Sequence, residues 1–301
     1  MKIFVTGAAG FVGRYVVRQI QSPKNKFLFL IRKKQDAGYF TKKNETVLVG
    51  DLNDCAKIGP AIKDFNPDVC IHLAWQGIPD YSAPISKMNL TQSIDLLDFL
   101  AQETSCKKMI ISGSCFEYGR THGVCEESKE VKTNSYFSWA KQSLYRYASL
   151  LCAQKNIELI WFRFFYVYGP GQRRKALIPT LIDSFKNKTA PPVNNPFNAN
   201  DFVFVEDVAR AFALALKKSI PPGIYNLGTG KASRVVDICR IVEKKIFGAS
   251  PLTQHLRKKF QRTQTVNFRA DIAKAQKNLG WRAQTDIKEG INRTIASLEE
   301  Q

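Results

Sequence analysis

The chain has 301 residues, 44% of them hydrophobic and 24% charged, which suits one large α/β domain or one domain with a smaller lobe. Its formal net charge is +19, but the basic residues are spread along the chain without a nucleic-acid motif, so we expect no nucleic-acid partner. No apolar run approaches the roughly 20 residues that span a bilayer, and no signal-peptide pattern precedes the first strand, so we expect a cytoplasmic protein with no membrane partner.

The first predicted element is a short apolar strand, residues 2–5, that leads through a glycine-rich loop into a helix. The loop reads TGAAGFVG over residues 6–13. Gly7 allows a tight turn, Gly10 lets the backbone approach a pyrophosphate, and Gly13 lets the helix lie close to the sheet. Strand, glycines and helix in this order predict a dinucleotide cradle; the alternative is a glycine-rich turn without a ligand.

Apolar strands then alternate with amphipathic helices, which predicts an α/β fold. We expect strands at 2–5, 27–31, 46–49, 69–73, 108–112 and 159–165, and helices near 11–21, 54–65, 85–104 and 135–155. Right-handed crossovers make this a Rossmann fold, a doubly wound parallel sheet covered on both faces. After Pro170 the rhythm changes to that of a smaller C-terminal α+β substrate lobe. We therefore predict a dinucleotide-binding domain over 1–168, with a strand and helix returning from about 200–230, and a lobe over 169–301.

The end of the second predicted strand is basic. Arg32, Lys33 and Lys34 follow it, and no carboxylate appears until Asp36. An acidic residue at this place binds the adenosine ribose 2′-hydroxyl, whereas a guanidinium suits a 2′-phosphate. The sequence therefore favours NADP(H) over NAD(H), unless these residues only begin a solvated loop.

Seven cysteines are scattered along the chain, and none forms a C-x-x-C motif. We expect neither a disulfide framework nor a metal site. Cys70 and Cys106 lie in or beside apolar runs and are predicted to be buried thiols.

Several motifs occur in one order along nearly the whole chain, and together they resemble the extended short-chain dehydrogenases/reductases, the NAD(P)-dependent nucleotide-sugar epimerases, dehydratases and reductases. They are TGAAGFVG at 6–13, Asp51-Leu52, HLAW at 72–75, SGSCFEYG at 112–119, RFFYVYGPG at 163–171, NDFVFVEDVA at 200–209 and the ending Asp271 with Leu279-Gly280-Trp281. Two departures, Tyr166 where the family often has Asn and Asn200 where it often has Arg, leave the nucleotide base unassigned.

The resemblance, with the basic strand end, assigns most of the site. Cofactor contacts are expected from Gly7, Gly10, Phe11, Val12, Gly13, Arg32, Asp51, Leu52, Leu73, Ala74, Lys141 and Tyr166. Substrate contacts are expected from Trp75, Ser114, Cys115, Arg173 and Arg269. Asn89 matches a position near the cofactor, or else is a helix N-cap.

The resemblance also implies a catalytic set of Ser114, Lys141 and a tyrosine four residues before the lysine. Phe137 stands at that place, on the same helical face as Lys141. Tyr136 lies five residues before Lys141, about 140° around the helix. Three explanations stay open: a deliberate Tyr→Phe replacement, which we favour; a natural enzyme that uses another acid, such as Tyr136 or water; and a natural binder without turnover.

These inferences predict an NADPH-dependent ketoreductase that acts on a nucleotide-linked 4-keto-6-deoxy sugar, with Phe137 impairing this copy. Ser114 would polarise the keto group, and the phenol missing at position 137, assisted by Lys141, would donate the proton. The alternatives are an NAD-dependent C4 epimerase and a non-catalytic NADP(H)-binding protein. The expected partner is a nucleotide-diphosphate sugar, and a homodimer through the helices near 85–104 and 135–155 is possible by family analogy.

Overall fold

The computed structural model describes residues 1–119, 122–249, 252–254 and 266–299, which fall into two compact units. Unit 1 comprises Met1–Arg120, Lys129–Phe164 and Ala209–Tyr225, and unit 2 comprises Thr121–Ser128, Phe165–Val208 and Asn226–Gln301. The chain therefore crosses between the units several times, and segment 121–128, which the predicted division at residue 168 assigned to the dinucleotide-binding part, groups with unit 2.

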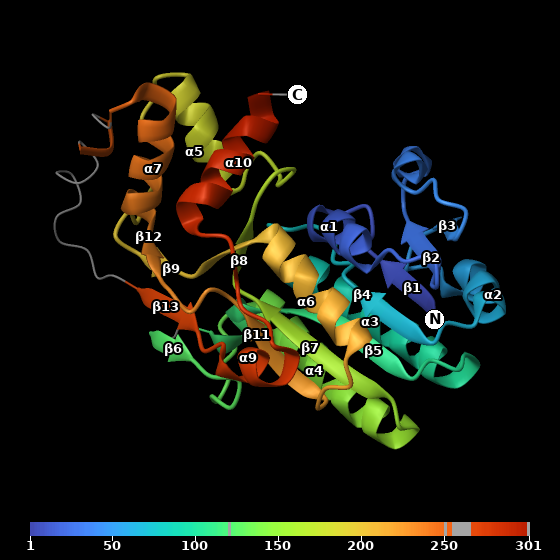
Figure 1. The fold of residues 1–301 in the computed structure, drawn as a ribbon. Coiled ribbons are helices and arrows are strands. Elements are labelled where there is room, and N and C mark those ends of the chain that lie inside the picture. The colour runs from blue at the N-terminus through green and yellow to red at the C-terminus, as the bar shows by residue number, and fades with distance from the viewer. Residues whose placement is uncertain (120–121, 250–251, 255–265, 300–301) are drawn as a thin grey trace. The chain divides into compact units, whose positions relative to one another are not determined.

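Unit 1 is built on a seven-stranded sheet with the order β11-β7-β5-β4-β1-β2-β3 (Figure 1). The last two residues of β11 belong to unit 2. The strands are β1 (Lys2–Thr6), β2 (Lys26–Ile31), β3 (Glu45–Val49), β4 (Val69–His72), β5 (Lys108–Ser114), β7 (Glu158–Phe164) and β11 (Gly223–Leu227). The six neighbouring strands β3, β2, β1, β4, β5 and β7 pair in parallel. The chain winds outward from β1 in both directions, and the predicted doubly wound α/β fold is confirmed.

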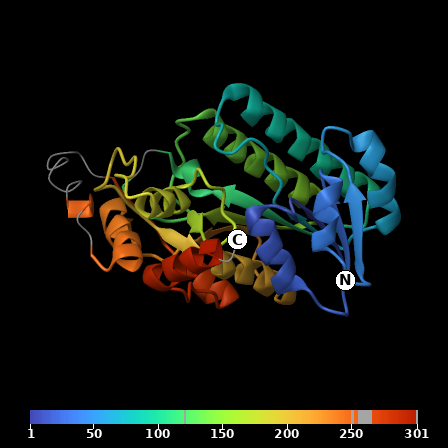
Figure 2. The same cartoon turned by 90° about the horizontal axis from the view of Figure 1, so that it is seen from above.

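Helices cover both faces of this sheet. They are α1 (Phe11–Ile20), α2 (Cys55–Phe65), α3 (Ala83–Glu103), α4 (Tyr136–Lys155) and α6 (Val205–Lys217), with short 3₁₀ turns η1 (Lys34–Tyr39) and η2 (Cys115–Tyr118). Figure 2 shows α3 and α4 on one face and α1 on the other. Within the described ranges, no helix has the length and hydropathy that a membrane span requires.

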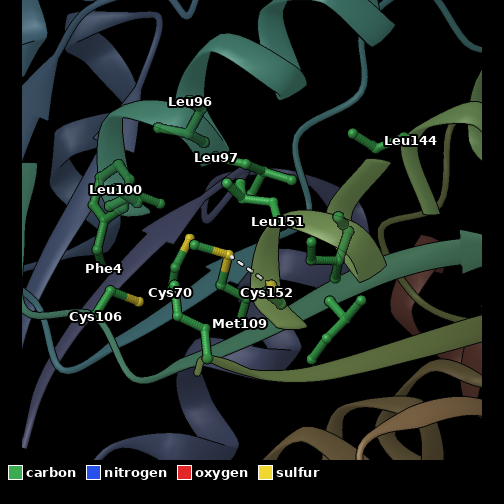
Figure 3. Packing of buried hydrophobic residues seen from close by; sticks show 14 of the residues in the cluster. Phe4, Cys70, Leu96, Leu97, Leu100, Cys106, Met109, Leu144, Leu151 and Cys152 are labelled. Atoms are coloured by element: carbon green, nitrogen blue, oxygen red, sulfur yellow. Dashed lines mark hydrogen bonds between the residues drawn. The ribbon is translucent and has the colours of Figure 1, made fainter. Parts of the chain in front are cut away.

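The core beneath α3 and α4 is apolar and rich in sulfur (Figure 3). Leucines of the two helices pack against strand residues such as Phe4 and Met109. The Cys152 Sγ lies 3.8 Å from the Met109 Sδ. Cys70 and Cys106 are buried, as predicted, and all seven cysteines are free thiols. Burial raises the pKa of the Cys106 thiol to about 11, so this sulfur is held as an unreactive thiol.

Unit 2 contains two small sheets and four helices of at least seven residues among its described residues. Its strands are β6 (Gly123–Cys125), β8 (Tyr166–Tyr168), β9 (Ala199–Asn200), β10 (Phe202–Phe204), β12 (Ser233–Arg234) and β13 (Asn267–Ala270). Its helices are α5 (Leu177–Lys186), α7 (Val235–Phe247), α9 (Ala273–Leu279) and α10 (Ile287–Glu299). The sheet orders are β10-β8 and β12-β9-β13-β6.

A buried carboxylate, Asp201, organises the centre of unit 2. Its oxygens accept hydrogen bonds from the backbone of Thr229, Gly230 and Ala270 and from the Thr229 hydroxyl. A Cβ at Gly228 would lie 2.6 Å from an Asp201 oxygen, so this loop closes around the carboxylate only with glycine there. The same side chain thus joins the end of β9 to β13 and the loop after β11.

Candidate functional site

A pocket of about 320 Å³ opens in unit 1 at the carboxyl ends of β1, β2 and β4. The winding direction reverses between β1 and β4, which is where open parallel sheets bind their ligands. The lining residues are Thr6, Gly7, Ala9, Gly10, Leu30, Ile31, Arg32, Lys33, Asp36, Gly50, Asp51, Leu52, Leu73, Ala74, Trp75, Gln76, Asn89, Gln92 and Ser93. The structure thus brings together seven residues predicted to bind the cofactor, at positions 7, 10, 32, 51, 52, 73 and 74.

The glycine loop forms one wall of this pocket. Gly7 has φ +72°, and a Cβ on it would lie 2.7 Å from the Ala74 backbone nitrogen. A Cβ on Gly13 would lie 2.0 Å from the Gly7 oxygen, so only glycine lets α1 begin so close to β1. Gly10 is the N-cap of α1. Gly7 and Gly13 therefore each have a separate steric reason to be where they are.

The first turn of α1 is suited to hold an anion. No side chain caps the helix, and its first turn contains no acidic residue. The backbone N–H groups of Phe11, Val12 and Gly13 therefore lack an intrahelical acceptor and face the end at which the helix dipole is positive. Although these three residues are not among the pocket's lining residues, their amides fit a dinucleotide pyrophosphate beside Gly10.

Charged side chains surround the end of β2. Arg32 and Lys33 line the pocket together with Asp36 of η1. The Arg32 Nη1 donates a 2.7 Å hydrogen bond to the Gln76 Oε1, and the Gln76 amide reaches Asp51 at 3.5 Å. This rim combines two cations with two carboxylates, Asp36 and Asp51, so it offers partners to both a phosphate and a ribose hydroxyl.

A buried polar chain runs under the pocket floor. The Thr6 hydroxyl lies 2.7 Å from the His72 Nδ1, and the His72 Nε2 lies 3.0 Å from the Ser93 Oγ. Ser93 donates its proton to the Asn89 carbonyl oxygen at 2.7 Å, so we infer that Nε2 carries the hydrogen and Nδ1 accepts from Thr6. Burial first, and the Lys141 charge second, lower the pKa of His72 to about 3, so the imidazole is neutral.

The hydrogen bonds of this buried polar series also fix the loop after β4. The Ala74 N–H donates to the Thr6 hydroxyl at 3.3 Å, and the Gln76 N–H donates to the Asn89 Oδ1 at 2.7 Å. The Asn89 amide donates in return to the carbonyl oxygens of Gln76 and Ile85. Asn89 is therefore an internal residue of α3 that anchors a loop, and not a helix N-cap; the N-cap is Ser82.

Ser114 stands at the carboxyl end of β5. Its Oγ accepts the Phe116 backbone N–H at 3.2 Å and caps η2. Since this bond uses an oxygen lone pair, the hydroxyl proton of Ser114 remains available to a substrate oxygen. The adjacent Cys115, also assigned to the substrate, is 3% exposed.

A buried ion pair supports Ser114 from below. Glu117 and Arg163 are 0% and 2% exposed, and the Arg163 Nε donates to Glu117 at 2.9 Å. The other Glu117 oxygen accepts the Ser114 N–H at 2.7 Å and the Trp161 indole N–H at 3.0 Å. A Cβ at Gly113 would lie 2.1 Å from that indole nitrogen. The carboxylate therefore joins β5 and β7 directly beneath the predicted catalytic serine.

Lys141 is a buried ammonium on α4. Its Nζ donates to the Ser112 carbonyl oxygen at 2.8 Å and lies 3.8 Å from the centre of the Trp75 ring. Burial lowers the pKa of Lys141 to about 7, and the opposing charge of Glu117 only partly offsets this. Trp75, which was assigned to the substrate, also lines the pocket and so connects it to Lys141.

Phe137 is 4% exposed and lies in an aromatic cluster. Among the described residues its ring contacts Trp75, Tyr81 and Phe116, with centroid distances of 5.5, 4.9 and 6.0 Å. The Trp75 ring therefore meets both Phe137 and the lysine one helical turn later. Tyr136 is 59% exposed and lines a separate groove between the N-terminal ends of α3 and α4.

Three predicted contacts, Tyr166, Arg173 and Arg269, belong to unit 2. Tyr166 lies on β8, where its N–H donates to the Asp201 carbonyl oxygen and its ring packs on Phe202. Arg173 is exposed after β8, and Arg269 is half-buried on β13. In the described ranges neither guanidinium has a hydrogen-bonding or ionic partner, which leaves both able to bind an anion.

Sequence reasoning missed several pocket residues. Gln76, Gln92 and Ser93 line the pocket, and no family motif pointed to them. The available signal was the spacing of Asn89, Gln92 and Ser93 on one predicted helix, because polar side chains at i, i+3 and i+4 share a face. All three are buried, which is uncommon for polar residues on a helix that covers a sheet.

Known proteins resemble this chain along most of its length. Residues 3–228 match the model of the NAD dependent epimerase/dehydratase family. The dTDP-glucose 4,6-dehydratase of Escherichia coli is 26% identical, with 98% of this chain and 92% of that protein covered. An uncharacterized UDP-glucose epimerase of Bacillus subtilis, YtcB, is 24% identical, with 99% and 98% covered.

Solved structures share the fold. UDP-glucose 4-epimerase from Thermotoga maritima, solved with UDP-glucose, has a TM-score of 0.83 and 22% identity over 100% of this chain and 99% of its own. A Tyr→Phe mutant of UDP-glucuronic acid 4-epimerase from Bacillus cereus, solved with a fluorinated nucleotide sugar and NAD, has a TM-score of 0.84 and 21% identity over the same shares. The family model covers three quarters of the chain and confirms the resemblance inferred from the motifs. The chain belongs to the NAD dependent epimerase/dehydratase family.

Proposed function

We propose that the chain is an NADPH-dependent ketoreductase acting on a nucleotide-linked 4-keto-6-deoxy sugar. The observation that carries this proposal is the guanidinium of Arg32 at the rim of the dinucleotide pocket, beside Lys33. Two cations at this place favour the additional phosphate of NADP(H), and net reduction in biosynthesis usually uses NADPH. The buried Lys141, which the pocket reaches through Trp75, also supports the proposal.

The described residues divide the work of holding the cofactor. The amides of α1 bind the pyrophosphate, Asp51 and Leu52 contact the adenine, and Lys141 donates to the nicotinamide ribose. When bound, the reduced nicotinamide supplies a hydride to the keto carbon. Lys141 can donate to the ribose while it keeps its bond to Ser112, because the ammonium has three donors and the structure uses one of them in a hydrogen bond.

The substrate side is proposed from the remaining polar groups. The Ser114 hydroxyl donates a hydrogen bond to the keto oxygen and so stabilises the negative charge that develops there. Arg173 and Arg269 hold the diphosphate, because planar guanidinium groups match phosphate oxygens. The ion pair under Ser114 keeps its backbone fixed while the substrate charge changes.

An NAD-dependent C4 epimerase is the second candidate. Asp36 also lines the pocket rim near Arg32, and a carboxylate there suits the ribose hydroxyl of NAD. The Bacillus cereus epimerase was solved with NAD, and the Thermotoga maritima enzyme is also a 4-epimerase. This candidate expects NAD⁺ to co-purify with the protein and a sugar to be interconverted without net consumption of cofactor.

The cofactor preference is tested by reversing the charge at the rim. Arg32→Asp is expected to weaken NADPH binding by about 10- to 100-fold, because one charge-assisted phosphate contact contributes roughly 1.5–3 kcal/mol, and to leave NADH binding within about threefold. Lys34→Asp makes the same charge change two residues away, outside the lining set, and is the matched control. Equal losses for both cofactors would contradict NADP(H) recognition by Arg32.

Turnover is tested with Phe137→Tyr, assayed by NADPH oxidation with a panel of 4-keto nucleotide sugars. A gain of about a hundredfold or more supports an enzyme disabled at this position, because loss of a general acid costs roughly 10²–10⁴-fold. If neither the wild type nor Phe137→Tyr oxidises NADPH with any of these sugars while cofactor is bound, the ketoreductase proposal fails. Epimerisation with bound NAD⁺ would support the second candidate.

A further inference from the structure

The aromatic cluster around Phe137 contains a hydroxyl that no motif assigned. Of the three rings that Phe137 contacts in the described part of the chain, Tyr81 is the one phenol. Its ring centre lies 4.9 Å from that of Phe137 and 5.7 Å from that of Phe116. Phe116 in turn donates its backbone N–H to the Ser114 hydroxyl. The Tyr81 ring therefore contacts both the ring at the place of the missing phenol and the turn that holds Ser114.

Local structure holds Tyr81 in this place. The Asp80 N–H donates to the Gly77 carbonyl oxygen at 2.7 Å, and the Asp80 carboxylate accepts the Ser82 N–H at 2.9 Å. Ser82 is the N-cap of α3, so Tyr81 sits between a closed turn and a helix start. The loop before it is tied to α3 through Asn89. A phenol held in this way loses little conformational entropy when a substrate binds.

Tyr81 is also half-buried, whereas the phenols near it in unit 1 differ in exposure or surroundings. Tyr136 points into the groove between α3 and α4. Tyr118 is 2% exposed and lies under the Arg163 guanidinium at 4.5 Å. The Tyr145 ring packs on Trp161 at 5.3 Å. A proton donor must meet the substrate and also exchange protons with solvent, and the Tyr81 side chain is partly exposed.

We propose that Tyr81 donates the proton to the sugar oxygen, in place of the phenol that Phe137 lacks. In the reductive direction the O–H bond of Tyr81 breaks and a new O–H bond forms on the former keto oxygen. The hydride that completes the alcohol comes from the reduced nicotinamide cofactor of the proposed function. The Tyr81 phenolate then recovers a proton from water. This inference rests on that proposed function and makes Phe137 a compatible residue of a working site.

Turnover of four proteins tests the proposal: the wild type, Tyr81→Phe, Phe137→Tyr and the double variant. Tyr81→Phe keeps the ring and is expected to lower kcat by about 10²–10⁴-fold. In the double variant, the phenol restored at position 137 is expected to recover at least tenfold of that loss. Tyr39→Phe removes an exposed phenol from η1, outside the pocket's lining residues, and is the matched control, with wild-type turnover expected.

Binding provides a readout that does not depend on turnover. Calorimetry with UDP- and dTDP-linked 4-keto-6-deoxy sugars should show about a tenfold loss of affinity in Tyr81→Phe, the loss expected for one hydrogen bond to the keto oxygen. UDP, dTDP and NADPH alone should bind within twofold of wild type. Weakening of all ligands together would indicate a general structural role for Tyr81 and overturn the proposal.

The outcomes separate this inference from the function on which it rests. Wild-type turnover that survives Tyr81→Phe overturns the inference and leaves the ketoreductase standing. An inactive wild type that gains activity in Phe137→Tyr does the same. Failure of both proteins to turn over any sugar nucleotide with cofactor bound refutes the proposed function itself. Loss of turnover in Tyr81→Phe with recovery in the double variant supports both.

Discussion

Replacing Lys141 by methionine is expected to stabilise the protein while it removes a residue needed for cofactor binding. The ammonium is 3% exposed, and burial lowers its pKa from 10.5 to about 7. At 1.36 kcal/mol per pKa unit, this displacement corresponds to a cost of roughly 4–5 kcal/mol for the charged form near neutral pH. Removing this cost stabilises the variant, but loss of the hydrogen bond to Ser112 destabilises it by about 1–3 kcal/mol. We therefore expect a net stabilisation of about 1–4 kcal/mol at pH 7.

The stability difference between Lys141→Met and the wild type should depend on pH in a defined direction. Because the native pKa of Lys141 lies below the unfolded value, the unfolded chain binds more protons between about pH 7 and 10.5. The free energy of unfolding of the wild type therefore gains from this group as the pH rises through that range. The advantage of Lys141→Met should be largest at pH 7 or below and should shrink toward pH 10. Urea unfolding at pH 6.5, 8 and 9.5 measures this difference.

Lys87→Met is the control, because Lys87 is an exposed lysine on α3 and its replacement should change stability by no more than about 0.5 kcal/mol. A Lys141→Met variant that is less stable than wild type at pH 7 would refute the reasoning. A stability difference that does not vary with pH would refute it as well. In either case the buried ammonium would be better compensated by Trp75 and Glu117 than the geometry indicates.

Three further predictions follow from other features. The pKa of His72 is lowered to about 3, so its contribution to stability should be lost as the pH falls below about 6.5, and His72→Gln should flatten urea-unfolding free energies over pH 4–6.5; an unchanged slope would contradict a neutral imidazole. Glu117→Gln should destabilise the chain by about 3–5 kcal/mol because it leaves the Arg163 charge buried and unpaired, and a loss below about 1 kcal/mol in the same assay would count against the pair. If α3 and α4 form the predicted homodimer, Leu150→Glu, at a side chain 67% exposed, should convert dimer to monomer in analytical ultracentrifugation, and a monomeric wild type would disprove it.

The sheet of unit 1 could be predicted because each of its signals is local. The six predicted strands, from 2–5 to 159–165, lie within two residues of the observed ends. Each strand is a short apolar run bounded by polar or turn residues, and the helices between them have one apolar face. The glycine spacing likewise reports steric conditions inside a single loop, as the close approaches at Gly7 and Gly13 show.

The rest depended on residues that meet only in the folded chain. β6 is three residues long and exists through its pairing with β13, nearly 150 positions later, so no local pattern marks it. The proximity of Trp75 to Lys141 and of Tyr81 to Phe137 arises because the loop after β4 folds back over α4. Spacing along one helix placed Phe137 and Lys141 together, but it could not indicate which other side chains complete the site.

The carboxylate beneath Ser114 also limits how this site can evolve. Glu117 and the Trp161 indole meet in the space that a side chain at Gly113 would occupy. A substitution at any one of these positions leaves a buried neighbour without its partner or without space. The sequence can therefore leave this arrangement only by changing several positions at once. A relative that shares the glycine, the glutamate, the tryptophan and Arg163 should therefore share the geometry of this strand end. That four-residue signature would identify such relatives even where overall identity is low.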